Sequence, residues 1–302
     1  MFPEAHQITA IAGAWGPLDG APRLVAEREN AVYAVRLADG RQGALRLHRP
    51  GYRSRAEITA ELRWTDALAA VGLPCPRPLA CADGALMPET EPCASMVSWL
   101  EGTAPQPDTA LTAGHAHAVG LLLRQLHDSA DSLPLPAFPG VGWTFETLLG
   151  PEPRMGRFWE NPALSARDQS LLKQTAEALP RALEKSPLTR MGLIHADPLR
   201  ENMMLCATGL HLIDFDDCGT GVRGYDLGTA LVQTVEAPGL EDRINALCDG
   251  YGLPDIQKDL PGFILLRALA SCGWAMTRLP QHAPRVRHYA DRACALAQSW
   301  SG

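Results

Sequence analysis

Four polar residues close together in the sequence are suited to phosphoryl transfer: His195, Asp197, Asn202 and Asp214. Phosphoryl transfer needs a group that accepts the proton of the attacking hydroxyl, and Mg²⁺ to neutralise charge on the phosphate oxygens. Asp197 is predicted to accept that proton, a role that accelerates reactions by roughly 10²–10⁴-fold. The side-chain oxygens of Asn202 and Asp214 are predicted to bind Mg²⁺, which prefers oxygen ligands. His195 is expected to hold the loop in place.

The motifs that contain these residues are Leu193-Ile-His-Ala-Asp-Pro-Leu-Arg-Glu-Asn202 and Leu212-Ile-Asp-Phe-Asp216. Their order and separation resemble the catalytic and metal-binding loops of eukaryotic-like kinases, most closely those of the aminoglycoside phosphotransferase and choline kinase family. The resemblance extends, more thinly, from about residue 24 to about residue 235. It implies an α+β, two-lobed protein-kinase-like fold, with a small antiparallel β-sheet lobe plus one helix and a larger, mainly helical lobe. It also implies an ATP- and Mg²⁺-dependent kinase that phosphorylates a hydroxyl of a small molecule.

The pattern of apolar residues predicts the elements of both lobes. Residues 31–37 and 43–48 alternate apolar and polar side chains on either side of a turn, which predicts an antiparallel hairpin. Ser54 is expected to cap a helix that runs to about Val71, and a strand is expected at 94–98. Helices are expected over residues 108–129, 165–184, 225–236, 240–251, 261–278 and 284–299.

The length of 302 residues and the 46% hydrophobic content allow two lobes. We expect a small N-terminal lobe over residues 1–98, a hinge over 99–106, and a large helical lobe over 107–302. The resemblance implies that the adenine of ATP contacts the hinge backbone near Ser98 to Leu100. An ordinary loop between a strand and a helix is the alternative.

An arginine stands where the resemblance would place the phosphate-binding lysine of the third strand. Arginine is always charged and can bind a phosphate through two donors, so Arg46 is predicted to bind the nucleotide phosphates. Arg36 is the weaker candidate, and a surface role for Arg46 is the alternative. A helix carboxylate should pair with Arg46, and Glu61 fits the family position better than Glu57, which lies one turn before it.

The turn expected to cover the phosphates, Val25-Ala-Glu-Arg-Glu-Asn30, contains no glycine, whereas protein kinases have three there. Family members often carry Glu-Asn before Val-Tyr, and Glu29 and Asn30 precede such a pair here. Backbone amides of this turn can still face phosphate oxygens, which makes Asn30 a candidate nucleotide contact. A plain hairpin turn explains the sequence equally well.

Only eleven residues separate Asp214 from Asp226, which is too few for the activation segment of a protein kinase. Ala196 also replaces the arginine that binds an activation-loop phosphate in protein kinases. Both features favour a small acceptor over a protein Ser/Thr kinase of the stress-response type. A nucleotide-binding pseudokinase scaffold is a further alternative, which the presence of Asp197 and both metal-ligand candidates opposes. The resemblance implies that Asp226 supports the catalytic loop, with a helix-capping acid as the alternative.

Leu199 departs from the family two residues after the catalytic acid, where protein kinases have lysine and many small-molecule kinases have histidine. The next residue, Arg200, is a candidate for contacting the γ-phosphate and stabilising its charge during transfer. The alternative is that Arg200 points into solvent.

Charge and cysteine content exclude several classes of protein. The net charge of −7 opposes nucleic-acid binding. Ten acids against three bases between residues 210 and 260 favour a cationic acceptor, such as an amino alcohol, amino acid or aminosugar, with solvated helix faces as the alternative. The eight cysteines show neither zinc-ligand nor disulfide spacing, and neither a secretory signal nor a membrane span is evident. We expect a cytoplasmic protein; its oligomeric state and its acceptor stay open.

Overall fold

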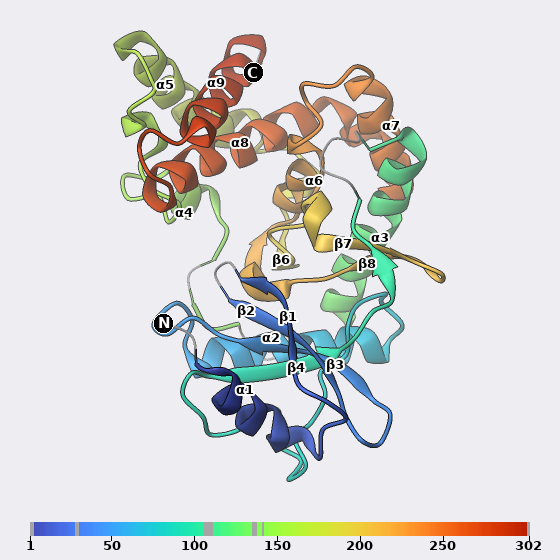
Figure 1. The fold of residues 1–302 in the computed structure, drawn as a ribbon. Helices are drawn as coiled ribbons and strands as arrows, with labels where there is room; N and C mark the ends of the chain where they lie inside the picture. Colours follow the sequence, from blue (N-terminus) through green and yellow to red (C-terminus); the bar gives the residue numbers. More distant parts are fainter. Residues whose placement is uncertain (1–2, 28–29, 106–110, 135–137, 141, 301–302) are drawn as a thin grey trace. The chain divides into compact units, whose positions relative to one another are not determined.

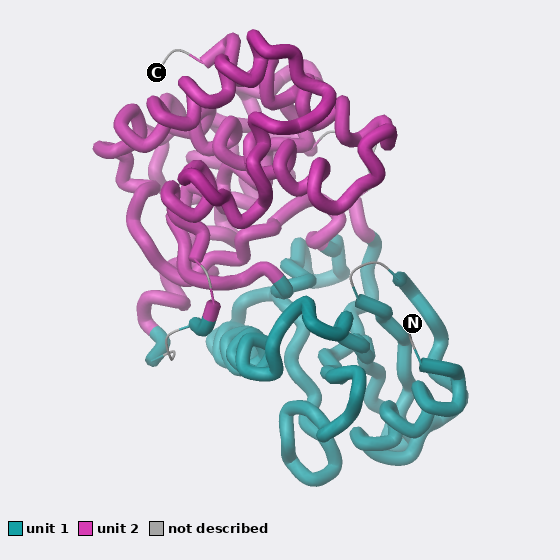
Figure 2. Tube along the Cα trace, turned by 90° about the vertical axis from the view of Figure 1, so that its left-hand side faces the viewer, with its two compact units in different colours: residues 1–103, 133–139, 204–216 teal, residues 104–132, 140–203, 217–302 magenta. Residues whose placement is uncertain are grey.

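The computed structural model describes residues 3–27, 30–105, 111–134, 138–140 and 142–300. The chain divides into two compact units, unit 1 (residues 1–103, 133–139 and 204–216) and unit 2 (residues 104–132, 140–203 and 217–302) (Figure 2). Residues 204–216, which were predicted to belong to the large lobe, belong to unit 1, where residues 205–206 pair with residues 102–103. The hinge over 99–106 stays a prediction, and residue 106 lies outside the described residues.

Unit 1 contains an antiparallel sheet with the strand order β1-β2-β3-β4 (Figure 1). Its strands are β1 (Arg23–Glu27), β2 (Ala31–Arg36), β3 (Gln42–Leu47) and β4 (Ala94–Ser98). The predicted hairpin is confirmed as β2 and β3, and the predicted strand as β4. The sequence analysis did not predict β1, whose five residues are all exposed and so lack the alternating burial pattern.

The alternation along β3 decides which way its arginine faces. Leu45 and Leu47 are buried in one cluster with the helix α1 (Ala5–Ala12), whereas Arg46 between them points to the opposite face of the sheet. The helix α2 (Arg55–Ala70) meets Arg46 on that face through Glu61. This helix begins as predicted, because Ser54 and Glu57 bond each other's backbone N–H groups in a capping box.

The segment that carries Asp214 completes unit 1. Strands β5 (Gly102–Thr103), β7 (Met203–Cys206) and β8 (Gly209–Leu212) form a second sheet. The backbone N–H of Leu212 donates to the carbonyl of Pro74 at 3.0 Å. The ring of Phe215 then packs edge-on against Trp64 of α2, with 5.6 Å between ring centroids. These contacts fix Asp214 and its neighbours against α2.

Unit 2 is mainly helical and includes one pair of strands. The predicted helices after residue 160 are confirmed, while the predicted start of the first helix at 108 lies outside the described residues. The sequence analysis missed α4 and the antiparallel pair β6 and β9. The elements are α3 (Ala113–Ser132), α4 (Phe145–Leu149), α5 (Ala166–Ala182), β6 (Met191–Ile194), β9 (Gly219–Val222), α6 (Arg223–Val232), α7 (Leu240–Tyr251), α8 (Leu260–Arg278) and α9 (Pro284–Ser299).

Two glycines allow α6 and α8 to approach closely. A Cβ atom on Gly228 would lie 2.3 Å from the carbonyl oxygen of Phe263, and one on Gly224 would lie 2.4 Å from the ring of Phe263. Helix α8 is long and apolar enough to cross a membrane by length and composition, but 78% of its most apolar window is buried inside the structure. It is therefore built like the core helix of a folded unit, packed against α6.

Candidate active site

The catalytic loop of unit 2, residues 195–202, is held by a buried carboxylate from α6. Asp226 is fully buried and accepts the backbone N–H groups of His195 at 3.0 Å and Ala196 at 2.7 Å. The Nε2 atom of His127 lies 3.0 Å from the same carboxylate. Ala196 has a φ of 67°, in the left-handed region, so the loop backbone needs such external support.

Both oxygens of the Asp197 carboxylate are engaged. The Nδ2 atom of Asn202 donates to Oδ2 at 2.8 Å and to the backbone carbonyl of Asp197 at 2.9 Å. Since the amide nitrogen faces Asp197, the amide oxygen, the atom that can bind a metal ion, faces away from it. On the other side, Nη2 of Arg267 donates to Oδ1 at 2.7 Å. The backbone N–H of Asp197 donates to Nδ1 of His195 at 3.3 Å, so His195 lies inside the loop.

Arg200 does not point into solvent. Its side chain is buried, and its Nε atom and backbone N–H both donate to Oε1 of Gln233, at 3.3 and 3.2 Å. Gln233 in turn donates to Glu201 at 2.8 Å. A contact between Arg200 and the γ-phosphate stays a prediction.

In unit 1, three carboxylates surround the guanidinium of Arg46. Its Nη1 atom lies 3.3 Å from Glu61 and also bonds Asp216, and its Nη2 atom lies 2.8 Å from Asp214. Glu57 instead accepts the backbone N–H of Ser54 at 2.8 Å. Of the two candidate glutamates, Glu61 is therefore the partner of Arg46.

Burial and the neighbouring charges shift the pKa values of the groups in this cluster. Burial would lower the pKa of Arg46, but Asp216, Asp214 and Glu61 outweigh that effect and raise it. Burial and the neighbouring Asp216 raise the pKa of Glu61 to about 8, although Arg46 lowers it. The Oε2 atom of Glu61 is buried and has no hydrogen-bond partner within the described part of the chain. At pH 7 Glu61 is therefore mostly protonated, and a further cation beside it would favour its ionised form.

Asp214 is the most accessible of the three carboxylates. Its side chain is 44% exposed, compared with 15% for Asp216 and 7% for Glu61. Its backbone has a φ of 63°, a left-handed conformation that non-glycine residues rarely adopt and that is frequent at functional sites. Asn202 belongs to unit 2 and Asp214 to unit 1, and their joint binding of a metal ion stays a prediction.

Asp216 is a member of this cluster that the sequence analysis did not single out. Its carboxylate accepts from Asn30, whose Oδ1 in turn accepts the backbone N–H of Arg49 at 3.1 Å. Arg53 donates to the backbone carbonyl of Asp216. Burial would raise the pKa of Asp216, but Arg46, His48, Arg53 and the hydrogen bond from Asn30 together outweigh it and hold that pKa below its usual value. The repeated Asp in Asp214-Phe-Asp216 was the available signal.

The predicted adenine contact involves backbone groups that already have partners. The backbone N–H of Ser98 donates to the carbonyl of Arg77 at 2.7 Å, and the backbone N–H of Trp99 donates to the carbonyl of Gln42 at 3.0 Å. A contact through either amide would have to replace an existing bond. Binding of adenine at Ser98 to Leu100 stays a prediction.

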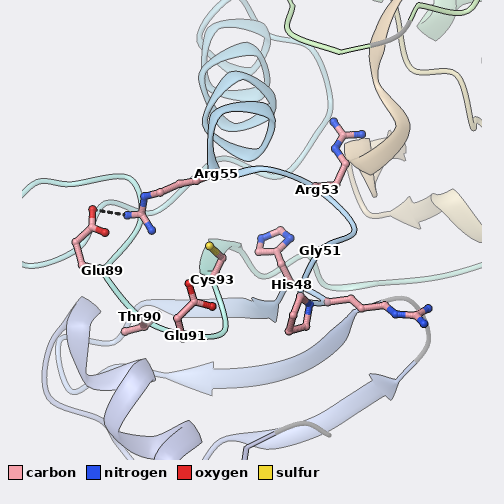
Figure 3. Close-up of a pocket in the computed structure, with 10 residues that line it drawn as sticks. His48, Gly51, Arg53, Arg55, Glu89, Thr90, Glu91 and Cys93 are labelled. Carbon is pink, nitrogen blue, oxygen red and sulfur yellow. Dashed lines mark ion pairs between the residues drawn. The ribbon is translucent and has the colours of Figure 1, made fainter.

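Unit 1 also has a pocket of about 450 Å³ outside the Arg46 cluster (Figure 3). Arg55 is paired with Glu89 at 2.9 Å, and Arg53 points away toward the segment that holds Asp216. Burial, and then Arg46, lower the pKa of the lining His48 to about 4, so it is neutral at pH 7. None of the predicted nucleotide or catalytic residues lines this pocket. Its lining is His48, Arg49, Pro50, Gly51, Arg53, Arg55, Glu89, Thr90, Glu91 and Cys93.

A sheet-bearing unit in which a strand cation pairs with a helix glutamate, and a helical unit with a buttressed catalytic loop, are features of protein-kinase-like phosphotransferases; here Arg46 takes the place of the usual lysine. The chain belongs to the phosphotransferase enzyme family, whose members it matches over residues 21–261.

Several kinases are similar to this chain. The structure of a microcompartment-associated aminopropanol kinase has a TM-score of 0.85 and 28% identity, covering 98% of this chain and 97% of the other. A homoserine kinase from Allorhizobium ampelinum is 30% identical over 213 residues, 67% of this chain and 58% of the relative. An amicoumacin kinase solved with AMP-PNP and Ca²⁺ shares the fold, with a TM-score of 0.78 at 17% identity over 98% of this chain and 94% of the other.

These similarities confirm the predicted family, the kinase-like fold and the class of enzyme, a small-molecule phosphotransferase acting on a hydroxyl. Neither alternative, the protein kinase nor the pseudokinase scaffold, is favoured by them. The chain spans between 53% and 61% of the length of the homoserine kinases that it matches.

Proposed function

We propose that this protein transfers the γ-phosphoryl group of ATP to the hydroxyl of a small amino alcohol, with Mg²⁺ as the metal. The observation that carries the proposal is the Asp197 carboxylate, which a buttressed loop presents and which two donors orient. A carboxylate oxygen can accept more than one hydrogen bond, so Asp197 can still accept the acceptor hydroxyl and take its proton. Arg46 would contact the phosphates, while Glu61 holds its guanidinium.

The residues of unit 1 fit a bound cation. A buried oxygen of Glu61 has no hydrogen-bond partner among the described residues, and the Asp214 carboxylate of the same cluster is 44% exposed. No three His, Cys, Asp or Glu side chains of the described chain form a metal site by themselves. Mg²⁺ does not need such a site, because one or two carboxylates, waters and phosphate oxygens complete its shell. Asp214 and Asn202 would hold it, and bound Mg²⁺ would neutralise charge on the phosphate oxygens.

The acceptor class is supported by chemistry that two relatives share. Aminopropanol and homoserine, the compounds named for two similar kinases, each carry a hydroxyl and an amino group. The acidic surplus of residues 210–260 is weaker support, because Asp214, Asp216 and Asp226 are engaged inside the protein. Other acids of that segment are exposed: Glu236, Glu241, Asp242, Asp249 and Asp255. A cytoplasmic location is supported by eight free thiols, five of which are buried.

An acceptor series tests the proposal directly. ADP formation would be followed with ATP, Mg²⁺ and 1-amino-2-propanol, ethanolamine, homoserine or an aminoglycoside. Propylamine, which lacks the hydroxyl, and 2-propanol, which lacks the amine, are the matched controls. We expect turnover with amino alcohols and none with propylamine. Equal turnover of 2-propanol would refute the acceptor class alone, whereas acceptor-independent ADP release in every reaction would refute the kinase.

Replacing Asp214 by alanine is expected to remove most of the Mg²⁺ dependence of nucleotide binding. Losing a carboxylate ligand should weaken Mg²⁺-dependent ATP binding by about 10–100-fold, the range seen when metal sites are impaired. Arg46 keeps Glu61 and Asp216 as partners in this variant, so the fold should persist.

Calorimetric titration of AMP-PNP with Mg²⁺ and with EDTA would measure this effect. The control is Asp19→Ala, which removes an exposed aspartate of unit 1. If the Asp214 variant retained the full difference between Mg²⁺ and EDTA, Asp214 would not be a metal ligand.

A further inference from the structure

Arg267 is a buried cation in the long apolar helix α8. Its side chain is 10% exposed, and it lies within the window of α8 that is apolar enough to cross a membrane. Burying a guanidinium carries a large desolvation cost, and apolar residues of similar volume often stabilise a protein equally well. Stability of α8 alone therefore gives little reason for an arginine at this position.

The two ends of the guanidinium have different partners. Nη2 donates to Oδ1 of Asp197 at 2.7 Å, and Nη1 donates to the hydroxyl of Tyr225 at 3.0 Å. Tyr225 comes from α6, the helix that also supplies Asp226 to the catalytic loop. Arg267 therefore connects the carboxylate of Asp197 to the same helix that fixes the loop backbone.

Tyr225 is itself fixed by stacking. Its ring is fully buried and stacks on Trp143, with centroids 5.3 Å apart and an interplanar angle of 22°. The indole Nε1 of Trp143 donates to the carbonyl of Asp217 at 2.8 Å, and the guanidinium of Arg154 lies 3.8 Å above the indole ring. The hydroxyl that holds Arg267 thus belongs to an aromatic group with little freedom to move.

The two donors to Asp197 restrain its carboxylate in different ways. Asn202 holds Oδ2 from within the loop, and Arg267 holds Oδ1 from α8. With one donor alone, the carboxylate can rotate about its Cβ–Cγ bond; with both, its plane is fixed. Misplacement of a reacting group by about 1 Å can cost about 10²-fold in rate, so this restraint is catalytically relevant.

We propose that Arg267 is the positioning residue of the catalytic carboxylate: held by Tyr225, it fixes the orientation of Asp197 toward the acceptor hydroxyl. It acts through Asp197 and contacts neither nucleotide nor acceptor. This inference rests on the proposed role of Asp197 as the proton acceptor.

Steady-state kinetics of full-length variants test the proposal, with 1-amino-2-propanol or the best acceptor of the series. Arg267→Met, of similar length and apolar, is expected to lower kcat by about 10–100-fold, with the KM values for ATP and acceptor unchanged. Arg267→Lys should recover part of the loss, because an ammonium can reach only one of the two partners. Tyr225→Phe should lower kcat in the same direction but less.

The control is Arg243→Met, which removes another buried arginine of unit 2. Arg243 donates to the backbone carbonyls of Thr234, Ala237 and Pro238, whereas Arg267 donates to Asp197. It should reduce thermal stability without a comparable loss of kcat per folded molecule. If both methionine variants lost kcat equally, Arg267 would be structural and the proposal would fail.

Other outcomes also decide the matter. A rise in the acceptor KM with kcat unchanged would make Arg267 an acceptor ligand, and wild-type kinetics in Arg267→Met would remove any role in turnover; either overturns the proposal. Should Arg267→Met not fold, Arg267→Lys and Tyr225→Phe carry the test, and unchanged kcat in both would refute it. An active Asp197→Asn variant would instead refute the proposed base, which keeps the two failures distinguishable.

Discussion

Replacing Asp197 by asparagine is expected to lower kcat by about 10²–10⁴-fold while leaving nucleotide affinity nearly unchanged. Asparagine keeps the size of the side chain but cannot take a proton from the acceptor hydroxyl. Its single amide oxygen can still accept from Arg267 or from Asn202, so the loop should keep its conformation. Phosphoryl transfer to the acceptor and calorimetric titration of AMP-PNP would measure the two quantities separately.

The matched control for this variant is Asp249→Asn, an identical chemical change at an exposed position of α7. It should retain wild-type kcat. Full activity in the Asp197 variant would show that another group accepts the proton. A parallel loss of nucleotide affinity would show that the change disturbed the loop rather than the chemistry.

The residues found from the sequence are those whose signals are local. The loop from His195 to Asn202 is a contiguous motif between apolar runs, and the Ser54 cap needs only the following turn. Arg46 was placed by the resemblance, at the family's lysine position on a predicted strand, and the alternation of that strand agrees with it, since Leu45 and Leu47 on either side are buried. Each of these features depends on fewer than about ten neighbouring residues. Rules based on the spacing of apolar residues and on helix capping can therefore predict it.

The residues that were missed depend on contacts between distant segments. Arg267 is 70 residues from Asp197, and their bond depends on α8 packing against α6 at Gly224 and Gly228. Asp216 is 170 residues from Arg46. The spacing of apolar residues along the sequence predicts neither contact. Both contacts arise from the packing of distant segments and not from a single helix or strand. A charged residue inside the apolar run of α8 was nevertheless visible in the sequence, and it was the available signal for Arg267.

The two units use the same principle to arrange charged groups. In each unit, the guanidinium of a buried or half-buried arginine bonds to carboxylates that would otherwise be free to rotate. This arginine is Arg46 in unit 1 and Arg267 in unit 2. Arginine suits this role because its planar group offers several donors in fixed directions. Substituting lysine at either position would preserve the charge but lose this geometry. A positive charge alone is therefore not enough to replace either arginine.

Replacing Asp226 by alanine is expected to destabilise the protein by roughly 3–5 kcal/mol, because each buried donor left without a partner costs about 1–3 kcal/mol. The N–H groups of His195 and Ala196 both lose their acceptor, and so does His127. The activity per folded molecule should also fall, because the loop then no longer maintains the left-handed conformation of Ala196. Urea unfolding at fixed pH would measure the free energy of unfolding.

Asp226 and Asp242 occupy the same kind of place, the first turn of a helix, but only Asp226 is buried. This makes Asp242→Ala the matched control, with an expected cost within about 0.5 kcal/mol, as for most surface substitutions. Asp226→Asn should be intermediate, because its single oxygen can accept one of the two loop N–H groups while its amide nitrogen faces the other. If Asp226→Ala cost no more than Asp242→Ala, Asp226 would be an ordinary helix-capping acid, and the catalytic loop would have to be held by its own internal bonds.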